Sequence, residues 1–67
     1  MTNTAKLNEI IRVSGLDRAF VAQMLGISSS SFEKRANGLT QFKTADISIM
    51  RDLFNLSSDQ LMEIFFS

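Results

Sequence analysis

The 67-residue chain holds few side chains that could carry out catalysis or bind a metal. It has no histidine and no cysteine, and its seven carboxylates are scattered along the sequence. Thiol and imidazole catalysis and the usual zinc ligands are therefore missing, and the sequence contains no glycine-rich loop that could cradle a phosphate. These features predict no enzyme activity, no catalytic residue, no metal and no cofactor. They also indicate no small-molecule ligand.

The remaining chemistry lies in charged and hydroxyl side chains, which are distributed unevenly. Seven Lys and Arg balance seven Asp and Glu, so the formal net charge is zero. Residues 1–16 carry two cations and one acid, for +1, and residues 17–43 carry four cations and two acids, for +2. Residues 44–67 carry one cation and four acids, for −3. An acidic C-terminal part that faces away from a polyanionic partner would help to orient the complex.

The middle of the chain has a pattern typical of two short helices joined by a tight turn. A small residue is needed at Ala22, because two helices that cross steeply bring their backbones close together. Gly26 can adopt a positive φ and reverse the chain after the first helix. Ile27 and Phe32 are expected to fill the space between the helices, and the Ser28 hydroxyl is expected to cap the second one. Together these residues predict a helix-turn-helix.

This segment, with the K-R-A-N-G sequence of residues 34–38, resembles the DNA-binding motif of the Cro and phage-repressor family, also called the XRE family. With the flanking helices, the resemblance covers nearly the whole chain. It implies an all-α fold, namely a compact five-helix lambda-repressor-like DNA-binding domain. This single domain would span residues 1–67, with the motif at about residues 18–38.

In that fold, the second helix of the motif lies in the major groove, and the helix before it spans the DNA backbone. By position in the motif, the resemblance implies four candidates for base contacts: Ser29, Ser30, Glu33 and Lys34. Serine hydroxyls donate or accept, a glutamate can accept from a cytosine amino group, and a lysine can reach guanine O6 or N7. The alternative is that the serines only cap the helix and that Glu33 and Lys34 are ordinary surface charges.

Phosphate contacts require cations or short donors at the groove edges, and helix N-termini supply backbone N–H groups. Arg18 is the strongest candidate, because it lies at the start of the first helix of the motif. Four further candidates are Gln23, Asn37, Lys43 and Thr44. Ordinary solvated surface is the alternative for each. An unpaired Glu33 near phosphates would oppose binding, so it should either read a base or pair with a neighbour such as Lys34 or Arg35.

Apolar spacing and capping residues predict five helices, at about residues 4–14, 17–25, 29–37, 44–54 and 57–66. Thr44 is expected to cap the fourth helix, Asn55 to end it in a left-handed conformation, and Ser57 with Gln60 to form a capping box at the start of the fifth. In the second helix, the residues expected to face the core are Phe20, Val21, Met24 and Leu25. The apolar stripe of the fourth is Ile47, Met50, Leu53 and Phe54.

The C-terminal apolar residues allow two interpretations. Met62 is expected in the core, and either Leu39 or Phe42 should turn back from the loop that precedes the fourth helix. A short apolar helix cannot hide every side in a small monomer. Core packing of Phe65 and Phe66 therefore competes with self-association through one of them.

These features favour a sequence-specific duplex DNA-binding transcriptional regulator, repressor-like and of phage or plasmid type. Residues 29–37 would enter the major groove of an operator, and a homodimer would bind an inverted repeat. The alternative is a protein-interaction module of the same fold, such as an antirepressor or a repressor-binding regulator, without strong DNA binding. The zero net charge and Glu33 support this alternative.

The sequence also predicts where the protein acts. No apolar run approaches the roughly 20 residues of a membrane span, and the N-terminus lacks the apolar core of a signal peptide. We therefore expect a cytoplasmic protein with no membrane partner.

Overall fold

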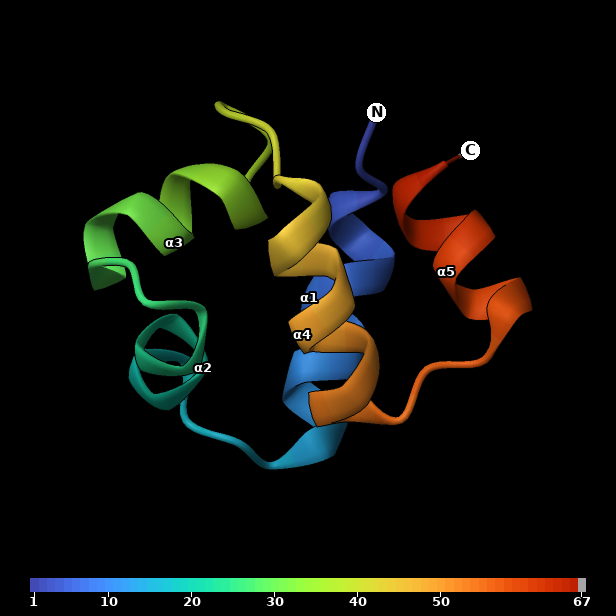
Figure 1. Ribbon diagram of the computed structural model, residues 1–67, viewed down its shortest axis with the longest axis horizontal. Helices are drawn as coiled ribbons and strands as arrows, with labels where there is room; N and C mark the ends of the chain where they lie inside the picture. The colour runs from blue at the N-terminus through green and yellow to red at the C-terminus, as the bar shows by residue number, and fades with distance from the viewer. Residues whose placement is uncertain (67) are drawn as a thin grey trace.

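Five α-helices make up the regular structure of residues 1–66, the part of the chain that the computed structural model describes (Figure 1). They are α1 (Thr4–Ser14), α2 (Arg18–Leu25), α3 (Ser29–Ala36), α4 (Thr44–Phe54) and α5 (Ser58–Phe65). No strand is present within these residues. The predicted all-α class with five helices is therefore confirmed. None of the helices in this part of the chain has the length and apolar character needed to cross a membrane.

Several helix ends follow the predicted local signals. The Ser28 hydroxyl accepts the backbone N–H of Ser31 at 3.1 Å and so caps α3. At the start of α5, the Ser57 N–H donates to Gln60 Oε1 at 2.9 Å, and the Gln60 N–H donates to Ser57 Oγ at 3.1 Å. Asn55 ends α4 with a φ of 53°. The predicted capping box and left-handed end are both confirmed.

The start of α4 differs from the prediction. Thr44 is the first helical residue, and Lys43 occupies the cap position that was expected for Thr44. The carboxylate of Asp46 accepts the backbone N–H of Lys43 at 2.9 Å. The side chain that stabilises this terminus therefore comes from inside the helix, where an acid also interacts favourably with the helix dipole.

One hydrophobic core holds the helices together. Helix α1 packs against α3, α4 and α5, whereas α2 packs against α3 and α4 (Figure 1). Phe42, from the loop before α4, lies between Phe32 and Phe65, with ring centroids 6.2 and 5.9 Å away. Leu39 is exposed, so Phe42 is the loop residue that turns back into the core. The large, fully enclosed side chains come from all five helices: Leu7, Ile11, Val21, Phe32, Met50 and Ile64.

Three residues expected in the core lie on the surface instead. Phe20 and Met24 of α2 and Met62 of α5 are exposed. A helix of eight residues buries one face only, and in α2 that face is offset by one position from the expected one. Its buried residues are Val21, Ala22 and Leu25.

The two phenylalanines at the end of the chain lie in different environments. Phe65 is 6% exposed and packs edge-on against Phe42, whereas Phe66 is 59% exposed. Of the two residues named as candidates for self-association, Phe65 therefore packs in the core, where its ring is enclosed. Phe66 remains available on the surface.

Candidate nucleic-acid interface

The turn between α2 and α3 is a sharp corner, and the two helices are not continuous. Gly26 adopts φ 72° and ψ 25°, a left-handed conformation that glycine reaches without steric cost. Its N–H donates to the Gln23 carbonyl at 3.0 Å, and the Ile27 N–H donates to the Ala22 carbonyl at 3.1 Å. This pair of bonds is typical of a Schellman helix end. Figure 1 looks almost along α2 while α3 runs across the view, so the helices are far from parallel.

The inner side of the corner is closed by apolar side chains. Ala22 and Phe32 are buried, and Ile27 is partly buried against the core. With Gly26 at the turn, each of the four motif residues has the burial or conformation that its position in the pattern requires. This packing fixes which face of α3 points to solvent.

The outer face of α3 is polar and exposed. Ser29, Ser30, Lys34 and Asn37 are all exposed, and their spacing places them on one side of a helix. The C-terminal helix α5 packs mainly against α1 and leaves this face open. A short polar helix therefore stands at the surface of the described chain.

Glu33, one helical turn after Ser29 on the same side of α3, forms a bidentate ion pair with Arg18 at the start of α2. Arg18 Nε donates to Glu33 Oε2 at 2.9 Å, and Arg18 Nη2 donates to Glu33 Oε1 at 2.8 Å. The guanidinium carbon lies 5.4 Å from the centroid of the Phe32 ring, within the range of a cation–π contact. Hydrogen bonding from Arg18 lowers the pKa of Glu33, and hydrogen bonding to Glu33 raises the pKa of Arg18. Both groups are therefore charged at neutral pH.

This ion pair bears on two predicted site residues. Glu33, expected to read a base or to pair with Lys34 or Arg35, is bound to Arg18 instead. Arg18, expected to contact phosphate, uses only part of its set of N–H donors on Glu33. Its side chain is about one-third exposed, so the remaining donors can still reach a ligand.

Two further polar contacts hold α3 in place, and the sequence analysis missed both. Arg35 Nη1 donates to Asp46 Oδ2 in α4 at 2.8 Å, and both side chains are largely buried. Asn8 Nδ2 in α1 donates to the Ala36 carbonyl at the end of α3 at 3.3 Å. An acid in the first turn of α4 was a usable signal for the first contact. The second joins residues 28 positions apart and left no pattern in the sequence.

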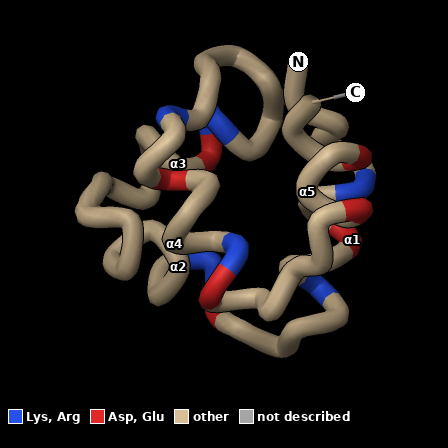
Figure 2. Tube along the Cα trace, turned by 45° about the vertical axis from the view of Figure 1, so that its right-hand side comes forward, with Lys and Arg blue, Asp and Glu red and all other residues tan. Residues whose placement is uncertain are grey.

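Most of the charged side chains neutralise one another in pairs, as the adjacent coloured segments of α1 and α5 illustrate (Figure 2). Five of the seven Lys and Arg are paired: Lys6 with Glu63, Arg12 with Glu9, Arg18 with Glu33, Arg35 with Asp46 and Arg51 with Asp52. Among residues 1–66, Lys34 and Lys43 are the cationic side chains that form no ion pair. Both are exposed, one on α3 and the other directly before α4. Of the acids in the same range, Asp17 before α2 and Asp59 in α5 are unpaired.

The other predicted phosphate contacts also lie on the surface. Gln23 is exposed on α2, Asn37 follows the last residue of α3, and Lys43 and Thr44 are exposed at the start of α4. The first residues of a helix have backbone N–H groups without intrahelical partners. Thr44 therefore presents both a hydroxyl and a helix N-terminus beside Lys43.

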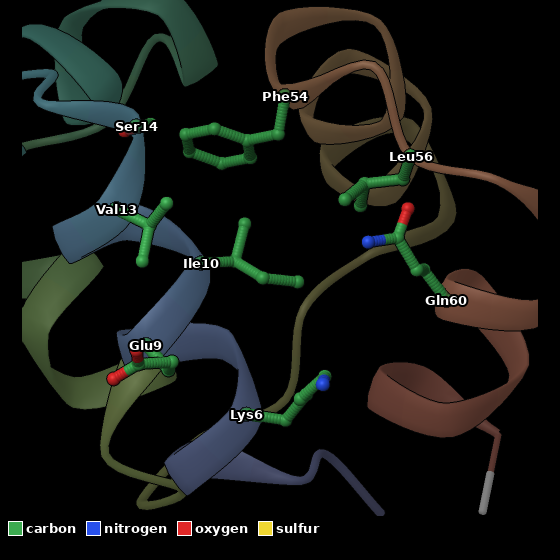
Figure 3. A pocket seen from close by; sticks show the side chains of 8 residues that line it. All are labelled: Lys6, Glu9, Ile10, Val13, Ser14, Phe54, Leu56 and Gln60. Atoms are coloured by element: carbon green, nitrogen blue, oxygen red, sulfur yellow. The ribbon is translucent and has the colours of Figure 1, made fainter.

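A hollow of about 330 Å³ lies away from this surface, between α1, the end of α4 and α5 (Figure 3). Ile10, Phe54 and Leu56 point into it, and no residue of α2 or α3 lines it. Its one carboxylate, Glu9, is paired with Arg12. No group of acids in residues 1–66 could hold a metal ion.

No protein-family model, curated protein or solved structure matches this chain. Support for a function therefore comes from the residues and geometry described above.

Proposed function

We propose that this chain is a lambda-repressor-like helix-turn-helix domain that binds duplex DNA sequence-specifically and regulates transcription, with α3 as its recognition helix. The observation that carries the proposal is the exposed polar face of α3, which carries Lys34, one of the two lysines that form no ion pair among residues 1–66. The protein would act by binding in the cytoplasm, as a repressor of phage or plasmid type, and without catalysis.

The chemistry of α3 suits the major groove, which is wide enough to admit an α-helix. Ser29 and Ser30 lie in its first turn, the part of a recognition helix that meets base edges in this docking geometry. Lys34 lies one turn further along and can donate to guanine O6 or N7. Hydroxyl groups donate or accept and discriminate weakly, so Lys34 would supply most of the sequence preference.

The phosphate contacts would come from both sides of α3. Lys43 and Thr44 present a cation, a hydroxyl and a helix N-terminus, and Gln23 and Asn37 add amide donors. Each neutralised phosphate contributes about −0.9 to the slope of log K against log salt. Because few cations are unpaired, we expect a slope of roughly −2 to −3 for one protomer, and modest nonspecific affinity.

A homodimer is the form in which this domain would read a full operator. The described chain offers one candidate recognition helix, α3, whereas two half-sites on one face of DNA lie about 34 Å apart. Two copies are therefore needed to occupy both. The ring of Phe66 is 59% exposed, so we assign the dimer contact to the surface around it.

A protein-interaction module of the same fold is the second candidate. The ion pairing of five of the seven cations supports it, because little positive charge remains to attract a polyanion. Such a module would bind another protein, for example a repressor, through the same exposed surfaces.

A salt titration of binding to random-sequence duplex DNA separates the two candidates. DNA binding predicts an affinity that falls with salt along the slope given above. Absence of binding even at low salt, together with a stable complex with another protein, would support the interaction module. Lys43→Ala is the matched variant, because it removes an unpaired cation and should make the slope shallower by about one.

A further inference from the structure

Helix α3 is tied to three different helices by polar side chains. Glu33 binds Arg18 of α2, Arg35 binds Asp46 of α4, and the Ala36 carbonyl accepts from Asn8 of α1. The contacts of Arg35 and Asn8 lie at the C-terminal end of the helix. The Glu33 contact differs from them because it lies in the middle of the helix and both partners remain partly exposed.

The Arg18 guanidinium is held from two directions. Its Nε and Nη2 atoms bind the two carboxylate oxygens of Glu33, and its carbon lies over the ring of Phe32, which is itself completely buried. A planar guanidinium fixed in this way has lost most of its rotational freedom before any ligand arrives. Its Nη1 donors have no hydrogen-bond partner in the described part of the chain.

Glu33 is correspondingly poorly placed to read a base. An ionised carboxylate that already accepts two charge-assisted hydrogen bonds would have to break them to accept from a cytosine amino group. Without Arg18, the same carboxylate would face the phosphates unpaired and repel them. The two side chains therefore suit a joint role better than the separate roles that the sequence predicts.

On the basis of the proposed DNA binding, we propose that Glu33 reads no base and is a positioning residue for Arg18. Glu33 holds the guanidinium against Phe32, and the remaining N–H groups of Arg18 bind one DNA phosphate. A series of contacts then runs from the Glu33 carboxylate in the middle of α3, through the Arg18 guanidinium at the start of α2, to the phosphate.

A double-mutant cycle on duplex DNA tests this arrangement. In the parent protein, Arg18→Ala should weaken binding to all duplexes about tenfold or more, because it removes a cation and leaves Glu33 facing the phosphates unpaired. In a Glu33→Ala background, Arg18→Ala should weaken DNA binding only about twofold to threefold. Glu33→Ala alone should leave the order of preferred sequences unchanged. Arg18→Lys should not restore binding, since an ammonium cannot reproduce the bidentate contact.

The control combines Glu33→Ala with Lys43→Ala. Lys43 forms no ion pair with Glu33, so the fold-losses in DNA affinity of the two single variants should multiply in the double variant. Thermal unfolding of every variant confirms that each protein is folded at the assay temperature. Equal losses for Arg18→Ala in both backgrounds, or a relaxed preference at one base pair in Glu33→Ala, would overturn the inference while DNA binding itself stands. If the parent protein binds no duplex at low salt, the proposed function fails, and this inference fails with it.

Discussion

The carboxylate of Asp46 and the guanidinium of Arg35 form an ion pair that is nearly enclosed between α4 and α3. Their side chains are 7% and 17% exposed, and the contact between Arg35 Nη1 and Asp46 Oδ2 is 2.8 Å long. The same carboxylate oxygen accepts the Lys43 N–H that opens α4. Among the described residues, no buried side-chain nitrogen or oxygen lacks a hydrogen-bond partner. One acid therefore fixes both the C-terminal end of α3 and the start of α4.

Asp46→Ala should destabilise the domain by about 3 kcal/mol, because it leaves a largely buried guanidinium without its partner and removes the cap of α4. For a domain of this size, the thermal midpoint should fall by more than about 10 °C. Asp59→Ala is the control, since Asp59 is exposed and makes no ion pair with another described residue. Adding Arg35→Met to Asp46→Ala should restore part of the lost thermal midpoint, because it removes the unpaired buried guanidinium. A midpoint for Asp46→Ala that matches that of Asp59→Ala would contradict the structural role given to this pair.

Gly26→Ala should lower the free energy of unfolding by about 1 kcal/mol, because alanine is strained at a φ of 72°. Denaturant unfolding measures this change. An added Cβ would meet no atom within 4 Å, so the loss reflects backbone conformation alone. Gly26→Asn should cost less, since asparagine tolerates the left-handed region. Equal stability of the alanine variant and the parent would mean that α2 and α3 do not meet at a left-handed turn.

The ion pair between Arg18 and Glu33 predicts a pH-dependent contribution to stability. Arg18 lowers the pKa of Glu33 in the folded state, so this contribution is present above the ordinary glutamate pKa of about 4.3 and is lost as the pH falls through the lower folded value. At pH 7, Glu33→Gln should lower the free energy of unfolding by about 0.5 kcal/mol, a small value because the Glu33 side chain is 43% exposed. Unfolding curves from pH 7 to pH 2.5 should show this difference shrinking below about pH 4. A difference that stays constant over the range would indicate that the ion pair adds no stability.

Ser30→Ala combined with Lys34→Ala should change which duplex sequences are preferred and leave the thermal midpoint nearly unchanged, because both side chains are exposed. Each lost base contact should cost about 1–3 kcal/mol at its own position. Competition binding against single-base variants of a preferred site measures this. Lys43→Ala, the matched control, should weaken all sequences alike. An unchanged order of preference in the double variant would show that the reading face lies elsewhere.

Phe66→Ser should weaken self-association without lowering stability, because the Phe66 ring is largely exposed in one copy. Sedimentation equilibrium over a range of concentrations should show a dimer for the parent and mainly monomer for the variant. The variant should also bind a half-site nearly as well as the parent does. A dimer that is equally stable in both proteins would contradict the assignment of the contact to this surface.

Local signals account for most of what the sequence predicted correctly. The helix ends at Gly26, Asn55 and Ser57 depend on residues within a few positions of one another, so the sequence was enough to find them. The rotation of α2 about its axis was not predicted. This eight-residue helix has apolar side chains on several sides, so the sequence alone does not determine which face is buried. Packing against α3 and α4 selects the face that contains Val21 and Ala22.

The candidate site was predictable as a set of residues but not as a set of contacts. The motif pattern indicated the outer face of α3, where Ser30 and Lys34 are exposed. The partner of Glu33 was not predictable, because Arg18 is 15 positions earlier and meets it only after the corner has formed. Of the two partners expected from proximity in sequence, Arg35 is held by Asp46, and Lys34 forms no ion pair with a described residue.

Selection of bound duplexes from a random pool is the decisive experiment on DNA recognition by α3, because it reports binding, sequence preference and symmetry at once. We predict enrichment of an inverted repeat whose half-sites lie about one helical turn apart, and loss of that enrichment in the Ser30→Ala, Lys34→Ala variant. A pool that stays random after repeated rounds at low salt, with the protein folded throughout, would contradict the assignment of α3 as a DNA-reading helix.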